Sequence, residues 1–281
     1  MTVPTIFDPA LVRRRRARAA MLGPATFLIE RVAAEMAERL ASVVRKFEHA
    51  ADLSPTDHVR RALAGTIDHV VAVDPTEETL RFEATPLDLV VSALALQAVN
   101  DLPGALAQIR RALKPDGLFL AALLGGDTLT ELRQSFAAAE AEMEGGVSPR
   151  VAPFADLRDM GSLLQRANFA LPVTDVDRVT VRYATPFALM QELRRMGATN
   201  PLVERRRVPL RRATLLRMAE LYAQRFSDPD GKVRATFEIV WLSGWAPHES
   251  QPKPLAPGSA RTRLADALGV SEQSAGEKPR R

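Results

Sequence analysis

Apolar residues repeat along this chain with two different periods, and the alternation between them predicts strands separated by helices. Residues 87–93, with Asp88 at the entrance, and residues 118–124 are mainly apolar runs, which are typical of strands buried on both faces of a sheet. Residues 173–183 instead alternate apolar and polar positions, as expected of an antiparallel strand. The full pattern predicts strands at 47–53, 68–73, 87–93, 118–124, 173–183 and 236–245.

Helical spacing occupies the intervals between these strands. Thr128 and Glu131 have the spacing of a capping box, which predicts a helix that begins at Thr128. Lys114–Gly117 predicts a tight turn before the strand at 118–124. One apolar stripe, typical of an amphipathic helix over 25–45, is formed by Phe27, Leu28, Val32, Met36, Leu40 and Val43 or Val44. The expected helices are 6–22, 25–45, 55–63, 103–113, 128–143 and 154–166, with two or three more in 186–226.

Strands that alternate with helices predict an α/β fold with a Rossmann-like, mostly parallel sheet and an antiparallel edge at its C-terminal side. Residues 75–86 are too few for a full strand-and-helix crossover, so one edge strand is expected to be missing. The predicted organisation has three parts: basic and amphipathic helices (1–45), a main domain (46–246) with a helical cap at 186–234, and a Pro-rich, largely disordered tail (247–281).

Composition narrows the class of protein without indicating a function. The 281 residues are 46% hydrophobic and 26% charged, which suits one large α/β domain. The absence of cysteine excludes disulfides, thiolate catalysis and cysteine-ligated metal. The four histidines show no metal-binding pattern, so no metal is expected. Neither a membrane-spanning run nor a secretory signal is visible, which favours a cytoplasmic protein.

Positive charge is concentrated in two short stretches, Arg13–Arg18 and Arg205–Arg212. A solvated helix face in an arginine-rich chain is the simplest explanation, and an acidic partner or a membrane surface is the alternative. The cap at 186–234 carries 11 Lys and Arg against 5 Asp and Glu, a net charge of +6 that suits an acidic partner. Nucleic acid is not expected as a partner, because no aromatic residues are interleaved with these arginines.

The carboxyl ends of the strands are the expected ligand edge of such a sheet. A glycine-rich turn normally follows the first strand, because bare backbone lets a ligand approach closely. Here that turn is Asp52-Leu-Ser-Pro-Thr-Asp-His58 and contains no glycine. Asp74 lies 22 residues after Asp52, at the end of the second strand, where an acid would bind ribose hydroxyls. A simple aspartate turn before Pro75 is the alternative explanation.

The stretch 87–133 reads LDLVVSALALQAVNDLPGALAQIRRALKPDGLFLAALLGGDTLTELR. It resembles the signature of class I S-adenosylmethionine-dependent methyltransferases of the complex I assembly factor 5 type. The malonyl-carrier-protein methyltransferase of biotin synthesis is a more distant relative. Further matches, which extend the resemblance over nearly the whole chain, are FDPALVRRRRARAA at 7–20, SPRVAPFADLRDMGSLLQRANF at 148–169 and DPDGKVRATFEIVWLSGWAPHESQPKP at 228–254.

This resemblance implies S-adenosylmethionine as the cofactor and a complex I subunit as the protein substrate or client. The modification would be methyl transfer or, as the mitochondrial relative implies, arginine hydroxylation. The cofactor motif is weakened, because Ser54, Thr56 and His58 replace the family's glycines and Gln97 replaces the histidine of its His-Trp pair. The cofactor-binding residues that the resemblance implies are Asp52, Ser54, Thr56, Asp74, Ser92, Leu94 and Gln97.

Catalytic residues are harder to predict, since methyl transfer needs mainly orientation and desolvation. Asp127 and Glu131 are candidate general bases, with helix capping and dipole compensation as the alternative explanation. The alternative function is a non-catalytic assembly chaperone that binds a complex I subunit through the cap and the N-terminal basic helix. Arg13–Arg18 would also allow peripheral contact with the inner face of the membrane.

Overall fold

The computed structural model describes residues 5–77, 79–82, 85–154, 156–252, 259 and 264–271. Contacts within the chain divide it into two compact units, residues 1–247 and residues 248–281. The second unit contains one short helix, α9 (Leu264–Leu268). The expected disorder of the Pro-rich tail falls largely outside the described residues. Within the described part, no helix combines the length and the apolar character that crossing a membrane requires.

The first unit is built on one six-stranded sheet with the order β2-β1-β3-β4-β6-β5. Pairing is parallel from β2 to β4 and antiparallel for β4–β6 and β6–β5, which confirms the predicted mostly parallel sheet with an antiparallel edge. The strand β2 lies at one edge, and the described residues between β2 and β3 contain no further strand, as expected from the short connection. The strands are β1 (His49–Asp52), β2 (His69–Ala72), β3 (Leu87–Ala93), β4 (Leu113–Leu124), β5 (Ala170–Tyr183) and β6 (Val233–Trp245).

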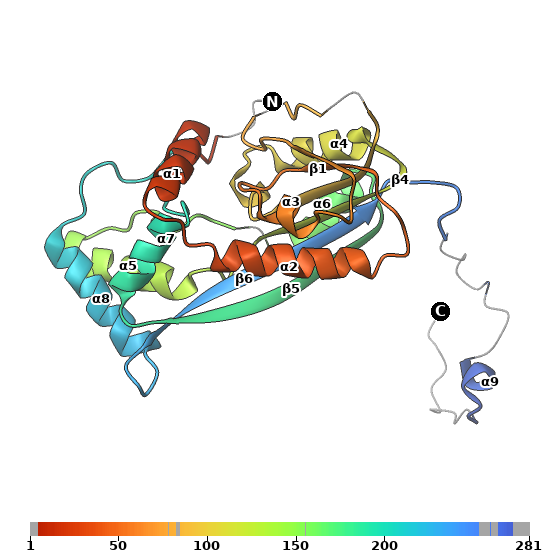
Figure 1. Cartoon of the computed structure of the whole chain (residues 1–281). Coiled ribbons are helices and arrows are strands. Elements are labelled where there is room, and N and C mark those ends of the chain that lie inside the picture. Colours follow the sequence, from red (N-terminus) through yellow and green to blue (C-terminus); the bar gives the residue numbers. More distant parts are fainter. Residues whose placement is uncertain are drawn as a thin grey trace. The chain divides into compact units, whose positions relative to one another are not determined.

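Helices cover both faces of this sheet. The side chains of β3 point alternately to the two faces, and on each face they join a different hydrophobic cluster. Leu89 and Val91 join the cluster formed with α2, α3, α5, α7 and α8, whereas Val90 joins the cluster formed with α4 and α6. Figure 1 shows α2 running along one face, and α5 packs against α8 beside the long β5–β6 pair. The helices of this unit are α1 (Pro9–Met21), α2 (Phe27–Ala41), α3 (His58–Ala62), α4 (Leu102–Ala112), α5 (Thr130–Glu144), α6 (Leu157–Arg166), α7 (Pro186–Arg195), α8 (Arg212–Phe226) and the 3-10 turn η1 (Leu96–Ala98).

The amphipathic helix α2 shows how local pattern becomes packing. Val32 and Met36 are fully buried against the sheet, as the predicted stripe requires. Full burial of side chains of this size stabilises a fold by about 1.5–3 kcal/mol each. The helix ends at Ala41 and not at residue 45 as predicted; beyond it Val43 still packs against the core, whereas Val44 is fully exposed.

The tight turn predicted at Lys114–Gly117 was wrong. Lys114–Gly117 is part of β4 rather than a separate turn, because Asp116 N donates to Ala246 O and Ala246 N donates to Gly117 O. Asp116 keeps a left-handed backbone (φ 62°) inside this strand. The helix α6, whose start was expected between Phe154 and Leu157, begins at Leu157, where the Asp156 side chain accepts a hydrogen bond from Arg158 N and caps it.

Candidate functional site

Asp52 ends β1 at the predicted ligand edge and is fully buried. Its Oδ1 accepts a hydrogen bond from Ser54 N (2.8 Å), and its Oδ2 pairs with Arg60 Nη1 (2.9 Å). Burial raises the pKa of Asp52, and the bonds from Ser54 and Arg60 oppose that rise only in part. The carboxylate is therefore already bonded within the protein, by an arginine that the sequence did not indicate.

The glycine-free turn after β1 is held by its own side chains. Ser54 Oγ accepts a hydrogen bond from Ala93 N (2.9 Å), which ties the turn to the end of β3. Thr56 Oγ1 and His58 Nδ1 are 2.8 Å apart and form a second bond within the turn. Neither Ser54 nor Thr56 has a positive φ, so the backbone conformation of this turn does not require glycine. The replaced glycines thus leave a turn that is more strongly cross-linked than a bare backbone would be.

The end of β3 contains polar atoms with no partner. Ser92 is fully buried, and its Oγ makes no hydrogen bond. Gln97 Nε2 donates to Leu94 O (2.9 Å), while the buried Gln97 Oε1 has no partner. Leu94 has a left-handed backbone (φ 52°), which is strained for a branched side chain. An unpaired buried polar atom costs about 1–3 kcal/mol, so this side of the edge fits a ligand that supplies hydrogen bonds.

Asp74 lies on the exposed side of the same edge, beside Asp52. Val73 N donates to Asp52 O (2.9 Å), so the two strand ends are adjacent. Asp74 Oδ1 accepts hydrogen bonds from Thr76 N (2.9 Å) and Thr76 Oγ1 (2.8 Å). This is the aspartate turn that was the alternative explanation for Asp74.

The N-terminal segment crosses this edge, which the sequence did not predict. Asn100 Oδ1 accepts hydrogen bonds from Ile6 N and Phe7 N, both at 2.8 Å, and Asn100 Nδ2 donates to Phe7 O (3.0 Å). Arg13 Nη1 donates to Thr76 Oγ1 (3.0 Å), which brings α1 to the end of β2. These contacts join residues more than 60 positions apart, so no local pattern could have indicated them.

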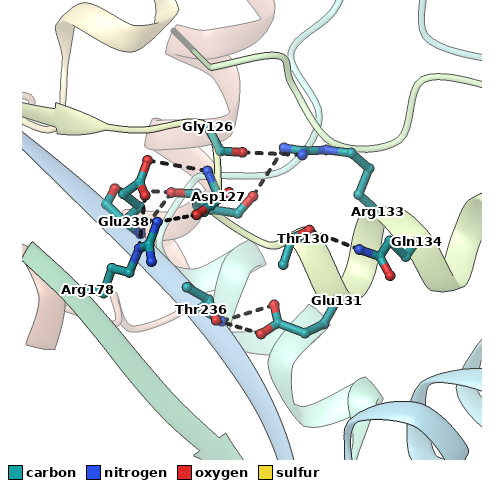
Figure 2. A network of polar contacts seen from close by, with 10 residues as sticks. Gly126, Asp127, Thr130, Glu131, Arg133, Gln134, Arg178, Thr236 and Glu238 are labelled. Atoms are coloured by element: carbon teal, nitrogen blue, oxygen red, sulfur yellow. Dashed lines mark hydrogen bonds and ion pairs between the residues drawn. The ribbon is translucent and has the colours of Figure 1, made fainter. Parts of the chain in front are cut away.

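The two candidate bases, Asp127 and Glu131, contact β5 and β6 instead of the residues at Asp52 (Figure 2). Asp127 Oδ2 pairs with Arg178 Nη2 (2.5 Å). Glu131 is buried, and it accepts hydrogen bonds from Thr236 N (3.1 Å) and Thr236 Oγ1 (2.6 Å). Both carboxylates therefore tie the start of α5 to the antiparallel edge of the sheet.

The capping box predicted at Thr128 was wrong. The helix α5 begins at Thr130, and Leu129 before it is left-handed (φ 55°) and makes no side-chain cap. Thr128 Oγ1 instead donates to Glu238 O and accepts from Glu238 N, both at 3.1 Å. The two residues have the capping-box spacing, but strand β6 lies close enough to take both side chains as partners.

The structure brings Asp52, Ser54, the β3 end and Asp74 together at one sheet edge. Among the described side chains, no group of three or more His, Asp or Glu is arranged to hold a metal ion. At the opposite, amino-terminal end of the sheet, the rings of His49 and His69 meet edge-on with centroids 5.9 Å apart. The ligand edge therefore carries hydroxyl, amide and carboxyl groups, together with the Arg60 guanidinium and the His58 ring.

Comparison with known proteins agrees with this architecture. A family model described as "Methyltransferase domain" matches residues 31–121. A putative methyltransferase from Bacillus halodurans aligns with a TM-score of 0.50 and 16% identity, over 76% of this chain and 99% of that one. The YcgJ protein of Bacillus subtilis aligns with a TM-score of 0.52 and 12% identity, over 78% of this chain and 99% of that one. These two likenesses show the fold.

Full-length relatives are more specific. The mitochondrial protein named arginine-hydroxylase NDUFAF5 is 36% identical in Danio rerio, with 95% of this chain and 91% of that protein aligned. The Homo sapiens protein of the same name is 39% identical, with 93% and 83% aligned. The malonyl-[acyl-carrier protein] O-methyltransferase of Xylella fastidiosa is 39% identical over 60% of this chain and 55% of its own length. The chain therefore belongs to the family of methyltransferase-domain proteins that includes arginine-hydroxylase NDUFAF5.

Proposed function

We propose that this protein acts in the assembly of respiratory complex I by modifying a complex I subunit, with S-adenosylmethionine bound at the carboxyl edge of its sheet. The proposal is supported by similarity to arginine-hydroxylase NDUFAF5 along 95% of the chain. It includes two reactions. Methyl transfer would use the methyl group of S-adenosylmethionine, whereas arginine hydroxylation, the activity in the relative's name, would also need O2 and a reductant, which S-adenosylmethionine does not supply.

The unpartnered polar atoms at the end of β3 carry the cofactor part of this proposal. Ser92 Oγ and Gln97 Oε1 are both buried without hydrogen bonds. The first belongs to β3 and the second to η1, which follows β3 directly. Buried polar atoms without a partner are rare in folded proteins, and a bound ligand that supplies the missing hydrogen bonds explains their presence here. When bound, S-adenosylmethionine would supply the methyl group for transfer. The residues that would hold it are Asp52, Ser54, Thr56, Asp74, Ser92, Leu94 and Gln97.

Each strand end has its own part in this binding. Asp74 keeps Oδ1 in the Thr76 turn, and a carboxylate at this position suits the ribose hydroxyls. Ser92 and Gln97 offer one hydroxyl and one amide oxygen to polar groups of the ligand. The turn after β1 would bind mainly through its backbone, because its side chains are bonded to one another.

A second candidate function, a non-catalytic assembly chaperone, is favoured by one specific observation. Arg60 and Ser54 already satisfy the Asp52 carboxylate. If Asp52 bound a ligand directly, its carboxylate would have to break these hydrogen bonds or share its oxygens with the ligand. On this proposal the protein binds a complex I subunit through its cap and α1, without the cofactor.

We further propose that the protein acts in the cytoplasm, at the inner face of the membrane, through α1. Arg14 and Arg18 are exposed on one face of this helix, and Met21 and Leu22 are exposed at its end. Basic side chains beside exposed apolar ones favour an anionic bilayer surface. Burial, the largest effect, and the nearby Arg205, Arg14 and Arg18 together lower the pKa of Arg15 to about 10, against an opposing effect of Asp8.

Calorimetric titration of the full chain with S-adenosylmethionine tests the cofactor. We expect micromolar binding that weakens at least about tenfold in Asp74→Asn, which keeps the acceptor for the Thr76 turn but removes the charge. Asp68→Asn is the matched control, because Asp68 is an exposed aspartate before the amino end of the same strand. No binding to the wild type at millimolar cofactor would overturn the cofactor assignment.

Deletion of the gene tests whether the protein acts in complex I assembly, and it separates the modifying enzyme from the non-catalytic chaperone. We expect a loss of assembled complex I, measured as NADH:quinone activity in membranes, and a subunit that lacks one methyl group or one oxygen in its intact mass. Restoration of complex I by Asp74→Asn without the mass increment would select the chaperone. Normal complex I in the deletion strain would refute both functions.

A further inference from the structure

A hollow of about 560 Å³ opens beside the end of β4, on the α5 side of the ligand edge. Gly126 lines it two residues after β4 ends. Leu94 N donates to Ala122 O (2.7 Å), so the parallel ends of β3 and β4 belong to the same edge. Most of its wall is apolar and consists of Ala137, Val147, Pro149, Val151, Pro153 and Phe154. A hollow of this volume is within the usual range of ligand-binding pockets.

The outer wall of this hollow is the loop at 145–154, which is fixed at two points. Glu140 of α5 is fully buried, and it binds Arg150 Nε (2.7 Å) and Ser148 N (2.7 Å). From the cap, Asn200 Nδ2 donates to Pro149 O (2.7 Å). Arg150 is thus neutralised by Glu140, and the loop forms a preformed wall.

Arg133 is the second cation of the hollow, and it has no carboxylate partner among the described residues. Its Nη1 donates to Gly126 O (3.3 Å) and its Nη2 to Thr128 O (3.2 Å), both long contacts to neutral carbonyls. Figure 2 shows the side chain reaching back from α5 toward Gly126. Since Glu140 compensates Arg150, the lining of the hollow retains one positive charge in mainly apolar surroundings.

We propose that this hollow binds an acidic side chain, flanked by aliphatic residues, of a protein client, and that Arg133 determines this specificity. A guanidinium that bonds only neutral carbonyls can form stronger, charge-assisted bonds to a carboxylate. The apolar wall accommodates the neighbouring aliphatic residues. The inference deepens the proposed function, on which it rests for the client, by assigning a recognition subsite next to the edge where the client would be modified.

The probe for this subsite is a pair of acetylated and amidated pentapeptides, Ala-Leu-Glu-Leu-Ala and Ala-Leu-Gln-Leu-Ala. Each peptide is titrated, without cofactor, into the full chain whose valine methyl groups carry a ¹³C label. Binding is followed by the NMR signals of these methyl groups. We expect the glutamate peptide to shift the methyl signals of Val147 and Val151 and to bind at least about tenfold more tightly than the glutamine peptide. Equal affinities, or no shift at either valine, would overturn the proposal.

Two pairs of variants locate the binding site. Val147 is 62% exposed, so Val147→Glu places a carboxylate at the mouth of the hollow with little effect on the fold, and Val147→Gln is its uncharged match. We expect the first to abolish binding of the glutamate peptide and the second to preserve it. Arg133→Gln should remove the preference for glutamate, whereas Arg158→Gln, at an exposed arginine of α6, should not. Unchanged binding in Val147→Glu would refute the site even if Arg133→Gln proved unstable.

Failure here is distinguishable from failure of the proposed function. The peptide titration needs neither cofactor nor turnover, so a glutamate preference would stand even if deletion of the gene left complex I intact. Conversely, a missing subunit mass increment in the deletion strain would support the proposed function even if both peptides bound equally.

Discussion

Glu131 connects the first turn of α5 to β6, and its replacement by alanine is expected to destabilise the protein strongly. The carboxylate is only 6% exposed. It accepts hydrogen bonds from both Thr236 N (3.1 Å) and Thr236 Oγ1 (2.6 Å). Glu131→Ala would leave a strand N–H and a hydroxyl without their acceptor in a half-buried position.

The size of the effect follows from these two bonds. A hydrogen bond to a charged group contributes about 1.5–3 kcal/mol, so the loss of both should lower the free energy of unfolding by about 3–6 kcal/mol. That is a large share of the roughly 5–15 kcal/mol that stabilises a typical domain. Glu131→Gln keeps one acceptor oxygen but loses the charge, and it should cost about half as much.

Urea unfolding followed by tryptophan fluorescence is the appropriate assay. The chain has two tryptophans, Trp241 and Trp245, and both lie on β6, the strand that Glu131 contacts. Glu220→Ala is the control, because the Glu220 side chain is 61% exposed and makes an ion pair with Arg217 on the same helix. Its removal should cost less than about 1 kcal/mol.

One result would refute this reasoning. If Glu131→Ala unfolded within about 0.5 kcal/mol of the wild type and yet failed to restore complex I in the deletion strain, Glu131 would act as the general base and not as a structural link.

Two further predictions concern the sheet. Asp88 accepts hydrogen bonds from Glu48 N (3.2 Å) and His49 N (3.1 Å) and pairs with Lys114; burial acts to raise its pKa, but these partners outweigh burial and lower it. In urea unfolding, the wild type should therefore have a higher free energy of unfolding than Asp88→Asn. The difference should be complete at pH 7, above the ordinary pKa of about 3.9, and should shrink as the pH falls through the lowered pKa of Asp88. A difference that grew in acid would contradict this prediction. Gly244→Ala would place a Cβ 2.9 Å from Phe169 Cβ, which belongs to a ring stacked on Phe119, and should lower the free energy of unfolding by about 1–3 kcal/mol. Gly126→Ala, with nothing within 4 Å of the added atom, should cost less than about 0.5 kcal/mol in the same urea unfolding assay, and equal losses for both would show that the contact with Phe169 is unimportant.

The sequence by itself determined the framework of this protein. The mainly apolar run at 87–93 became β3 with the same bounds, because a strand buried on both faces is apolar at nearly every position rather than at alternate ones. The short connection after β2 predicted the missing edge strand, since chain length limits a crossover. The family was also readable, because its signature lies in contiguous stretches of the chain.

Only the tertiary structure decided what the polar side chains bind. Thr128 and Glu131 have the spacing of a capping box, yet their partners are Glu238 and Thr236 on a strand more than 100 residues away. Asp52 stands where the sequence placed it, but its pairing with Arg60 became visible only in the fold. Periodicity records which residues are buried, because burial depends on the local face of a helix or strand. The partner of a buried polar group depends on which distant element packs against it, and that information is absent from any short stretch of sequence.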